Sequence, residues 1–238
     1  MKVRMGTNEK KEFDCWFVSI IVWSVIIAVI IGLTTFYLLV KFGTEDQKCN
    51  EEKEFFTMTI DKNYPGLVPC ENYYRLEGDL ITAENLGIEV DIFVDGRIKA
   101  SGWIKGLGFV TASGPIMSGG DIQAYGRIGS GASITSGGGI YSGINIIAND
   151  WIEAGGDILS VGNIKAGEWI KSGGDIQTNG PIESGEHITA GGEIFTIGTI
   201  EAGQEIEAGG DVTSGGDIKT VDGIKSGGKV RSGLGIIK

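Results

Sequence analysis

Proline, histidine and basic residues are scarce in this chain, and each shortage argues against a class of protein. Four prolines beside 41 glycines fit neither a collagen repeat nor a proline-rich disordered linker. Lysine and arginine number 20 against 31 acidic residues, and the resulting net charge of −11 disfavours a nucleic-acid-binding surface. His187 is the only histidine, so any histidine-based general base must be this residue.

Charged residues are absent from one long segment near the N-terminus. The 26 positions from Cys15 to Val40 carry no charge and lie between Asp14 and Lys41. At about 1.5 Å per residue, a helix of this length exceeds the roughly 30 Å hydrocarbon core of a bilayer. No small-residue cleavage site follows the segment, so we expect an uncleaved transmembrane helix over residues 15–41, with the lipid bilayer as a partner.

Basic residues flank this segment unequally and predict its orientation. Four lysines or arginines precede the span, and three follow it within residues 41–53. The positive-inside rule then places the N-terminus in the cytoplasm and the remainder of the chain outside. Cys49 and Cys70 would both lie on the outer side, where they either form a disulfide or remain two free thiols.

A six-residue repeat fills the C-terminal two thirds of the chain. Every sixth residue from Leu80 to Ile236 is Leu, Ile or Val, which makes 27 positions, 22 of them Ile. Every residue two places later, from Ala100 to Ser232, is Ala, Ser, Thr or Gly. Because residues i and i+2 of a strand share a face, each hexapeptide places one large and one small side chain inward. Corners such as Gly173-Gly174-Asp175 follow, where we expect glycine to adopt positive φ.

A second period of 18 residues lies on top of the first. Gly-Gly pairs begin at residues 119, 137, 155, 173, 191, 209 and 227, always 18 apart. Three hexapeptide sides therefore close one coil, and stacked coils pair in parallel at about 4.8 Å spacing. The pattern predicts an all-β, triangular parallel β-helix of about nine coils. The expected organisation is a polar tail (1–14), the transmembrane helix (15–41), a linker or N-terminal cap (42–78) and the β-helix (79–238).

Two segments of the repeat carry a resemblance to a known family. Residues 119–128 read GGDIQAYGRI and residues 183–194 read ESGEHITAGGEI. They resemble the bactofilin-type, polymer-forming β-helix proteins, and the resemblance extends over residues 79–238. It implies a right-handed core with three sides per coil. It also implies end-to-end assembly into nonpolar filaments at membranes, with a second copy or another β-helix protein as partner.

The left-handed hexapeptide helix of acyltransferases has the same 18-residue coil, but its small residues occupy other places. That family favours a small residue two places before the aliphatic one. Here the small residue lies two places after it, as Ala166 follows Ile164. The difference argues against the left-handed helix and against an enzyme, so acyl transfer through His187 is a distant third interpretation.

Acidic residues recur at the 18-residue spacing along one corner. Asp157, Asp175, Glu193 and Asp211 should stack with their carboxylates about 4.8 Å apart. A divalent cation such as Ca²⁺, bridging these oxygens, is one interpretation. Corner capping, in which Asp oxygens accept backbone N–H groups, is the favoured one, so we expect neither a metal nor another cofactor.

Two surfaces qualify as binding sites. Trp151 and Trp169 lie 18 apart and directly precede inward isoleucines, so their rings should stack on an outer edge with His187 next in line. This edge fits a glycan, a protein partner or mutual shielding. At the C-terminal tip, the repeat continues to Ile236 without a polar cap and should leave strand edges open as a template for another chain. The expected assembly interface comprises Val230, Leu234, Ile236 and Ile237.

Charge also distinguishes the tip. Residues 183–217 carry eight acids and no lysine or arginine, whereas residues 218–238 carry five bases and one acid. Together these patterns favour a nonenzymatic, single-pass membrane protein whose β-helix self-assembles as a scaffold or surface array. The alternative is a surface-displayed recognition rod that binds a glycan or protein through the edge of Trp151 and Trp169.

Overall fold

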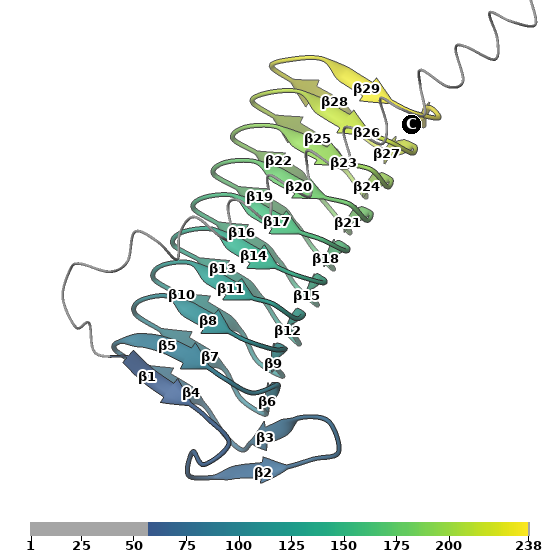
Figure 1. The fold of residues 1–238 in the computed structure, drawn as a ribbon. Coiled ribbons are helices and arrows are strands. Elements are labelled where there is room, and N and C mark those ends of the chain that lie inside the picture. The colour runs from purple at the N-terminus through teal and green to yellow at the C-terminus, as the bar shows by residue number, and fades with distance from the viewer. Residues whose placement is uncertain (1–56, 238) are drawn as a thin grey trace, which may run out of the picture. The chain divides into compact units, whose positions relative to one another are not determined.

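The chain folds as a parallel β-solenoid throughout the part that its structure describes. The computed structural model describes residues 57–237, which contain 30 strands and no helix. The strands wind in about nine coils with an 18-residue repeat, so the predicted parallel solenoid is confirmed. Figure 1 shows the coils stacked from the N-terminal strands to the last coil.

Three sheets form the three sides of each coil. Sheet A has 10 strands in the order β1 (Thr57–Ile60), β5 (Asn85–Ile88), β8 (Ile104–Gly106), β11 (Ile122–Ala124), β14 (Ile140–Ser142), β17 (Ile158–Ser160), β20 (Ile176–Thr178), β23 (Ile194–Thr196), β26 (Val212–Ser214) and β29 (Val230–Ser232). Sheet B has 11 strands in the order β2 (Leu67–Pro69), β3 (Tyr74–Leu76), β6 (Ile92–Val94), β9 (Val110–Ala112), β12 (Ile128–Ser130), β15 (Ile146–Ala148), β18 (Ile164–Ala166), β21 (Ile182–Ser184), β24 (Ile200–Ala202), β27 (Ile218–Thr220) and β30 (Ile236–Ile237). Sheet C has nine strands in the order β4 (Leu80–Thr82), β7 (Ile98–Ala100), β10 (Ile116–Ser118), β13 (Ile134–Ser136), β16 (Ile152–Ala154), β19 (Ile170–Ser172), β22 (Ile188–Ala190), β25 (Glu205–Ala208) and β28 (Gly223–Ser226).

From β3 onward, each strand pairs in parallel with the strand 18 residues further along the chain. In sheet C, Ile116 lies opposite Ile134, and in sheet B, Ile164 lies opposite Ile182. Because the offset is constant, large inward residues stack on large ones and small on small. β2 differs, because it runs antiparallel to β3 at the N-terminal edge of sheet B.

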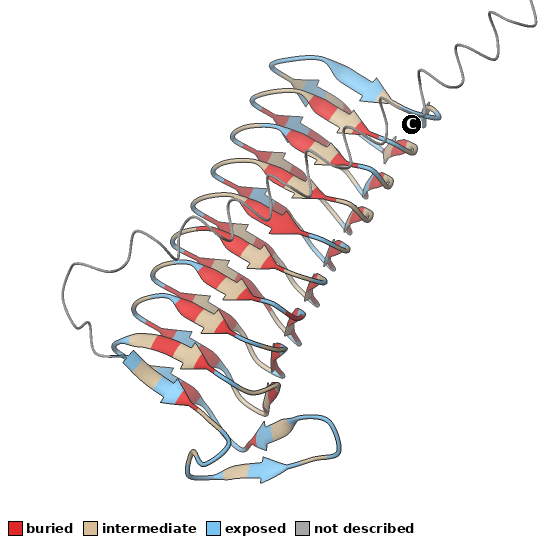
Figure 2. Cartoon of the chain, viewed as in Figure 1, coloured by how far each residue is buried: buried red, intermediate tan, exposed pale blue. Residues whose placement is uncertain are grey.

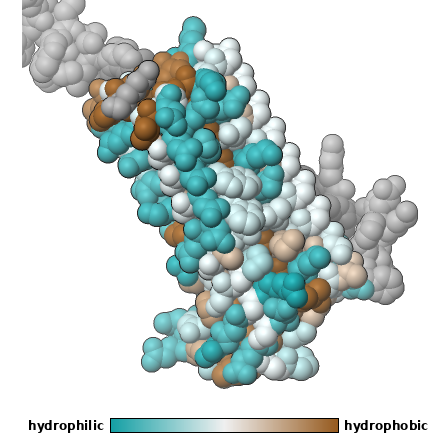
Figure 3. Space-filling model, turned by 180° about the vertical axis from the view of Figure 1, so that it is seen from behind, coloured by the Kyte–Doolittle hydropathy of each residue, from teal (hydrophilic) through white to brown (hydrophobic). Residues whose placement is uncertain are grey.

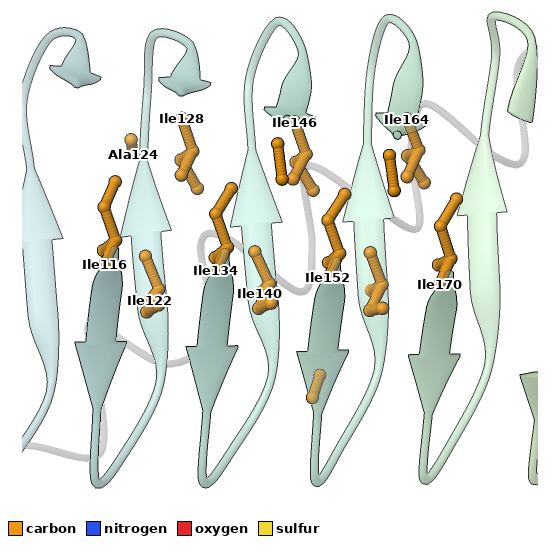
Figure 4. Packing of buried hydrophobic residues seen from close by; sticks show 14 of the residues in the cluster. Ile116, Ile122, Ala124, Ile128, Ile134, Ile140, Ile146, Ile152, Ile164 and Ile170 are labelled. Atoms are coloured by element: carbon orange, nitrogen blue, oxygen red, sulfur yellow. The ribbon is translucent and has the colours of Figure 1, made fainter. Parts of the chain in front are cut away.

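Stacked isoleucines fill the interior of the coils. The side chains of Ile116, Ile134 and Ile152 follow one another along the core (Figure 4), and each is 0 % exposed. Buried residues alternate with more exposed ones along the strands (Figure 2). Burying each large side chain stabilises the fold by roughly 1.5–3 kcal/mol. The six-residue period thus reflects a three-residue strand, whose first and third residues face inward, followed by a three-residue corner.

Serine at the small inward position forms hydrogen bonds that residue size alone did not predict. The Ser136 hydroxyl donates to the carbonyl oxygens of Gly120 at 2.6 Å and of Gly139 at 3.0 Å. The Ser142 hydroxyl likewise donates to the Gly126 carbonyl oxygen at 2.8 Å. Buried polar groups need such partners, and no buried side-chain nitrogen or oxygen lacks one in the described part of the chain. These serines therefore tie the corners of successive coils together.

The repeated Gly-Gly corners allow close stacking and do not adopt positive φ, so the sequence prediction for them is wrong. Among the described glycines, positive φ occurs at Gly66, Gly78 and Gly223. A Cβ atom on Gly173 would overlap the carbonyl oxygen of Gly155, one coil earlier. The backbones of successive corners therefore approach each other closely, and glycine removes the atom that would separate them.

The N-terminal segment departs from the six-residue repeat yet joins the same sheets. β1 pairs in parallel with β5 in sheet A, and β3 pairs in parallel with β6 in sheet B. Ile60 is 0 % exposed, Leu76 is 8 % exposed, and Tyr64 packs partly buried against the core. Residues 57–78 therefore cover apolar side chains of the first coil. Residues 42–56 of the expected linker or cap lie outside the described residues.

The expected polar tail (1–14) and transmembrane helix (15–41) also lie outside the residues that the structure describes. Between residues 57 and 237, no helix is long and apolar enough to cross a membrane. The membrane anchor and its orientation stay predictions.

Candidate functional site

No strand among residues 57–237 covers the core side chains of the last coil. β28, β29 and β30 are the terminal strands of sheets C, A and B, and no other described strand pairs with their outer edges. Val230 is 36 % exposed and Ile236 is 49 % exposed, whereas Val212 and Ile218, one coil earlier, are 0 % exposed. Figure 2 shows the same change from buried to exposed residues at this end.

The residues of the expected assembly interface come together at this end. Val230 and Ile236 occupy inward positions of β29 and β30, and Leu234 lies in the corner between these strands with 79 % of its surface exposed. Ile237 lies opposite Lys219 in sheet B and is 49 % exposed. Viewed from behind, hydrophobic residues gather near the end that carries the last coil (Figure 3). The end thus combines apolar side chains with three strand edges.

Backbone groups at this end are suited to pairing with another strand. One coil earlier, the Val212 N–H donates to the Lys229 carbonyl oxygen at 2.9 Å, and the Ile218 N–H donates to the Gly235 carbonyl oxygen at 3.0 Å. The equivalent N–H groups of Val230 and Ile236 point along the same ladder toward the outer edge. Such an edge is a template for an added strand.

Three basic residues of the tip form ion pairs with acids of the same chain, namely Lys219, Lys225 and Arg231. Lys225 Nζ lies 2.8 Å from Glu205 Oε1, and Arg231 Nη1 lies 2.6 Å from Asp211 Oδ2. Glu205 raises the pKa of Lys225, through a hydrogen bond and its charge. The pKa of Asp211 is lowered, first by the Lys229 backbone N–H and then by the Arg231 guanidinium. These ion pairs neutralise part of the positive charge that distinguishes residues 218–238 in the sequence. The tip is therefore less basic than its composition indicates.

Three of the four acidic corner residues, Asp157, Asp175 and Asp211, cap backbone groups as the favoured interpretation predicted. No such bond is found for Glu193 among the described residues. Asp157 Oδ1 accepts the Asp175 N–H at 3.0 Å, and Asp175 Oδ1 accepts the Glu193 N–H at 2.8 Å. Asp211 Oδ1 accepts the Lys229 N–H at 2.7 Å. Within residues 57–237, no group of three or more His, Cys, Asp or Glu side chains is arranged to hold a metal ion.

The two tryptophans stack as their spacing predicted. The ring centroids of Trp151 and Trp169 lie 5.7 Å apart, and the ring planes differ by 8°. Both residues are half-buried, so the edge is less exposed than the sequence indicated. His187 follows in the same column, where its carbonyl oxygen accepts the Ile170 N–H at 2.9 Å. The column presents a flat aromatic stack with an imidazole beyond it.

The structure also contains two depressions that the repeat pattern did not reveal. One, of approximately 460 Å³, lies on the outer face of sheet B and is lined by Phe93, Arg127, Gly129 and Ile147 among others. The signal for it is Gly129, an outward position without a side chain between larger outward residues. The other, of approximately 470 Å³, lies at the N-terminal end around Tyr64 and Leu76.

The expected Cys49–Cys70 pair falls partly outside the described residues. Cys70 lies in the turn between β2 and β3, half-buried, with its Sγ 3.9 Å from the Val68 carbonyl oxygen. Since Cys49 is not among the described residues, the disulfide stays a prediction.

Comparison with protein-family models, curated proteins and solved structures finds no match to this chain. The resemblance to bactofilin-type β-helices therefore stays a prediction from the repeat pattern.

Proposed function

We propose that this chain is a nonenzymatic, membrane-anchored structural rod that assembles through its C-terminal end. One observation carries the proposal: inward residues that are fully buried elsewhere are exposed in the last coil, as Ile236 is 49 % exposed while Ile218 is 0 % exposed. Exposed apolar side chains beside open strand edges favour association with another β-structure.

The partner best matched to this end is a second copy of the same end. Two identical ends related by a two-fold axis bring their terminal strands together in antiparallel pairs, as an isologous contact requires. If the axis passes through sheet B, β30 with Ile236 lies against its counterpart, and β29 with Val230 lies against β28 of the other copy. The N-terminal end is a poorer partner, because its inward side chains are already buried, as Ile60 at 0 % and Leu80 at 2 % exposed. Docking against the side of another rod, or onto a different β-helix protein, is the alternative geometry.

The proposed function also includes a membrane anchor, a cytoplasmic N-terminus and a right-handed coil. Support for the anchor comes from the charge-free run from Cys15 to Val40, and support for a cytoplasmic N-terminus comes from the basic residues before it. The bactofilin-type resemblance supports a right-handed coil. The net charge of −11 disfavours nucleic acid as a partner.

The test uses the full-length chain purified in detergent micelles. Sedimentation and negative-stain electron microscopy would compare the wild type with Ile236→Lys, which places a cation in the exposed edge. The matched control is Thr135→Lys, an outward position in the middle of sheet C beside Glu153. We expect end-to-end dimers in the wild type and the control, and their loss in Ile236→Lys. Assembly that persists in Ile236→Lys would refute the end contact.

A second candidate function rests on the stacked tryptophans. A flat aromatic surface suits the apolar face of a sugar ring, so the edge of Trp151 and Trp169 fits a glycan-recognition rod. Titration with chito-oligosaccharides, followed by tryptophan fluorescence, would test it. Saturable binding that Trp169→Ala abolishes would favour recognition over assembly. If fluorescence does not respond, the stack serves as mutual shielding.

A further inference from the structure

One corner of the solenoid carries a row of exposed apolar side chains. It lies between sheets A and B, where every coil contributes three residues. Leu107, Tyr125, Val161 and Ile197 fall in one column, separated by 18 or 36 residues, and are 56 %, 48 %, 40 % and 37 % exposed. Further large exposed hydrophobic residues at this corner are Phe109, Ile144 and Leu234. We call these seven residues the A–B corner stripe.

The other two corners differ from this one. Trp103 is the exposed large hydrophobic residue described at the corner between sheets C and A. The corner between sheets B and C instead has Val221 exposed and the half-buried stack of Trp151 and Trp169. The stripe is therefore a property of one corner and is not a general feature of the repeat. A periodic sequence can place such residues at any corner, so their collection at one of three requires a cause.

Over several coils, the corner itself and the sheet A side of the stripe are free of charge. Its corner segments 143–145, 161–163, 179–181 and 197–199 contain no Asp, Glu, Lys or Arg. The outward residues of sheet A are also uncharged from Gln123 to Thr213. Sheets B and C instead carry ion pairs, such as Lys165–Glu183 at 2.7 Å and Lys171–Glu153 at 3.2 Å.

We propose that the A–B corner stripe is a side-by-side docking surface for a second copy of this chain. Two chains of charge −11 repel each other through most of their surfaces, and the uncharged strip is where they can touch without opposing like charges. The same acidic charge disfavours an anionic lipid surface as the occupant. Both rods share the coil spacing, so apolar residues that recur every one or two coils can meet their counterparts along the whole contact.

The contact is made by side chains, because the corner backbone already has partners. The Val161 N–H donates to the Ser142 carbonyl oxygen at 3.1 Å, and the Gly143 N–H donates to the Ala124 carbonyl oxygen at 2.9 Å. Strand addition is therefore unavailable at this corner. This separates the stripe from the C-terminal end, where strand edges are open.

The size of the stripe makes the contact weak between free molecules. From Leu107 to Ile197 the chain rises five coils, about 24 Å. A ridge of that length buries on the order of a few hundred Å² per partner, below the roughly 800 Å² of a stable interface. Tethering to one surface raises the effective concentration and would make the contact persistent. That strengthening rests on the proposed membrane anchor, whereas the contact itself rests on the stripe alone.

Site-directed crosslinking of the full-length chain in detergent micelles tests the proposal. Val161→Cys places a thiol on the stripe, and Thr135→Cys places a matched thiol on sheet C. A short bismaleimide links thiols that lie close together, and mass spectrometry identifies the linked peptides. We expect links between two copies at position 161, several-fold above those at position 135 and above the wild type with its native cysteines.

Charge substitution then tests whether the apolar character matters. The double variant Val161→Lys and Ile197→Lys should weaken side-by-side association about tenfold or more, because it opposes like charges across the contact. Thr135→Lys should leave it unchanged, and unaltered thermal unfolding of both variants shows that the fold is intact. Equal crosslinking at positions 135 and 161 would overturn the proposal, as would a link from position 161 to Cys15 or Cys49 of the same copy.

The proposed end-to-end contact and the proposed side-by-side contact can be refuted independently of each other. Ile236→Lys removes end-to-end assembly if the proposed function is correct, and it should leave crosslinking at position 161 intact. If crosslinking at position 161 is lost in Ile236→Lys, side-by-side pairing is only a consequence of end assembly and the stripe is not a docking surface.

Discussion

The N-terminal and C-terminal ends of the solenoid differ in how far their inward side chains are exposed to solvent. At the N-terminal end, Ile60 is 0 % exposed and Leu76 is 8 % exposed, and β2 runs antiparallel along the edge of sheet B. At the C-terminal end, Val230 is 36 % exposed and Ile236 is 49 % exposed. The difference shows that an inward position of an end coil is buried where further residues pack against it, as Tyr64 packs against the core at the N-terminal end.

This asymmetry limits how the rod can assemble. At the N-terminal end, no described strand pairs with the outer edges of the terminal strands β1, β2 and β4 either, but inward side chains there are buried, as Ile60 at 0 % and Leu80 at 2 % exposed. Pairing through the C-terminal end displaces nothing among the described residues. The C-terminal end is therefore the end that the proposed assembly would use.

The largest expected effect comes from burying a charge at equivalent positions of sheet B. Ile92→Asp near the N-terminal end and Ile164→Asp in mid-rod should each lower the free energy of unfolding by roughly 3–5 kcal/mol, because the carboxylate has no partner. Ile236→Asp should cost about 0.5 kcal/mol or less, since its side chain meets solvent. Chemical denaturation and limited proteolysis measure the loss of stability in each of the three variants. Equal losses at positions 164 and 236 would contradict the difference between interior and end.

An intermediate effect is expected from adding one methyl group at a corner. Gly173→Ala should destabilise the fold by about 1–3 kcal/mol, because the new Cβ overlaps the Gly155 carbonyl oxygen. Gly235→Ala is the matched control in the last coil, where the nearest atom to such a Cβ is Asp217 Oδ1 at 3.8 Å. Thermal unfolding should show a lowered midpoint for the first variant alone. A normal midpoint for Gly173→Ala would mean that the corners are less tightly stacked than described.

The smallest expected effect concerns two capping carboxylates near opposite ends. The pKa of Asp79 is lowered first by the Arg97 backbone N–H and then by its side chain, and the pKa of Asp211 is lowered first by the Lys229 backbone N–H. A lowered folded-state pKa stabilises the fold above the ordinary carboxyl range, and this contribution is lost as the pH falls through the folded-state value. Asp79→Asn and Asp211→Asn should therefore be slightly less stable than the wild type near neutral pH and converge with it in acid.

Hydrogen exchange can locate these small losses. After Asp211→Asn, lost protection should spread through β29, which has a neighbour on one side only. After Asp79→Asn, it should stay near Arg97, because sheets continue on both sides there. A difference from the wild type that does not change with pH would show that the carboxylate charge is not the cause.

The repeat predicted the strands closely, but it could not predict the first coil. β4 begins at Leu80 and β30 begins at Ile236, as the six-residue pattern indicated. β1 was placed in the linker or cap, yet it joins sheet A with Thr57 opposite Asn85. Its offset of 28 residues replaces the usual 18 because the β2–β3 hairpin intervenes, and an irregular insertion leaves no periodic signal.

The repeat was defined by inward residues, so it predicted the features formed by outward side chains less completely. The tryptophan stack could be predicted, because an 18-residue spacing places two identical side chains directly above one another. The A–B corner stripe has the same kind of spacing but became visible only when exposure was known for every corner. The pairing of Arg231 with Asp211 could not be read from the charge blocks, because it depends on side-chain reach across a corner.

The sequence by itself determined the coil, the register and the core of this protein. A strict six-residue alternation of large and small residues has one economical solution, in which the large ones stack inside and the backbone pairs coil to coil. Tertiary structure alone decided how much of each residue meets solvent. Leu159 occupies an outward position and yet is 2 % exposed, with Tyr141 and Gln177 as its register neighbours. The exposed fraction of a side chain depends on which residues of the adjacent coils pack over it. The periodicity of the sequence does not specify that packing.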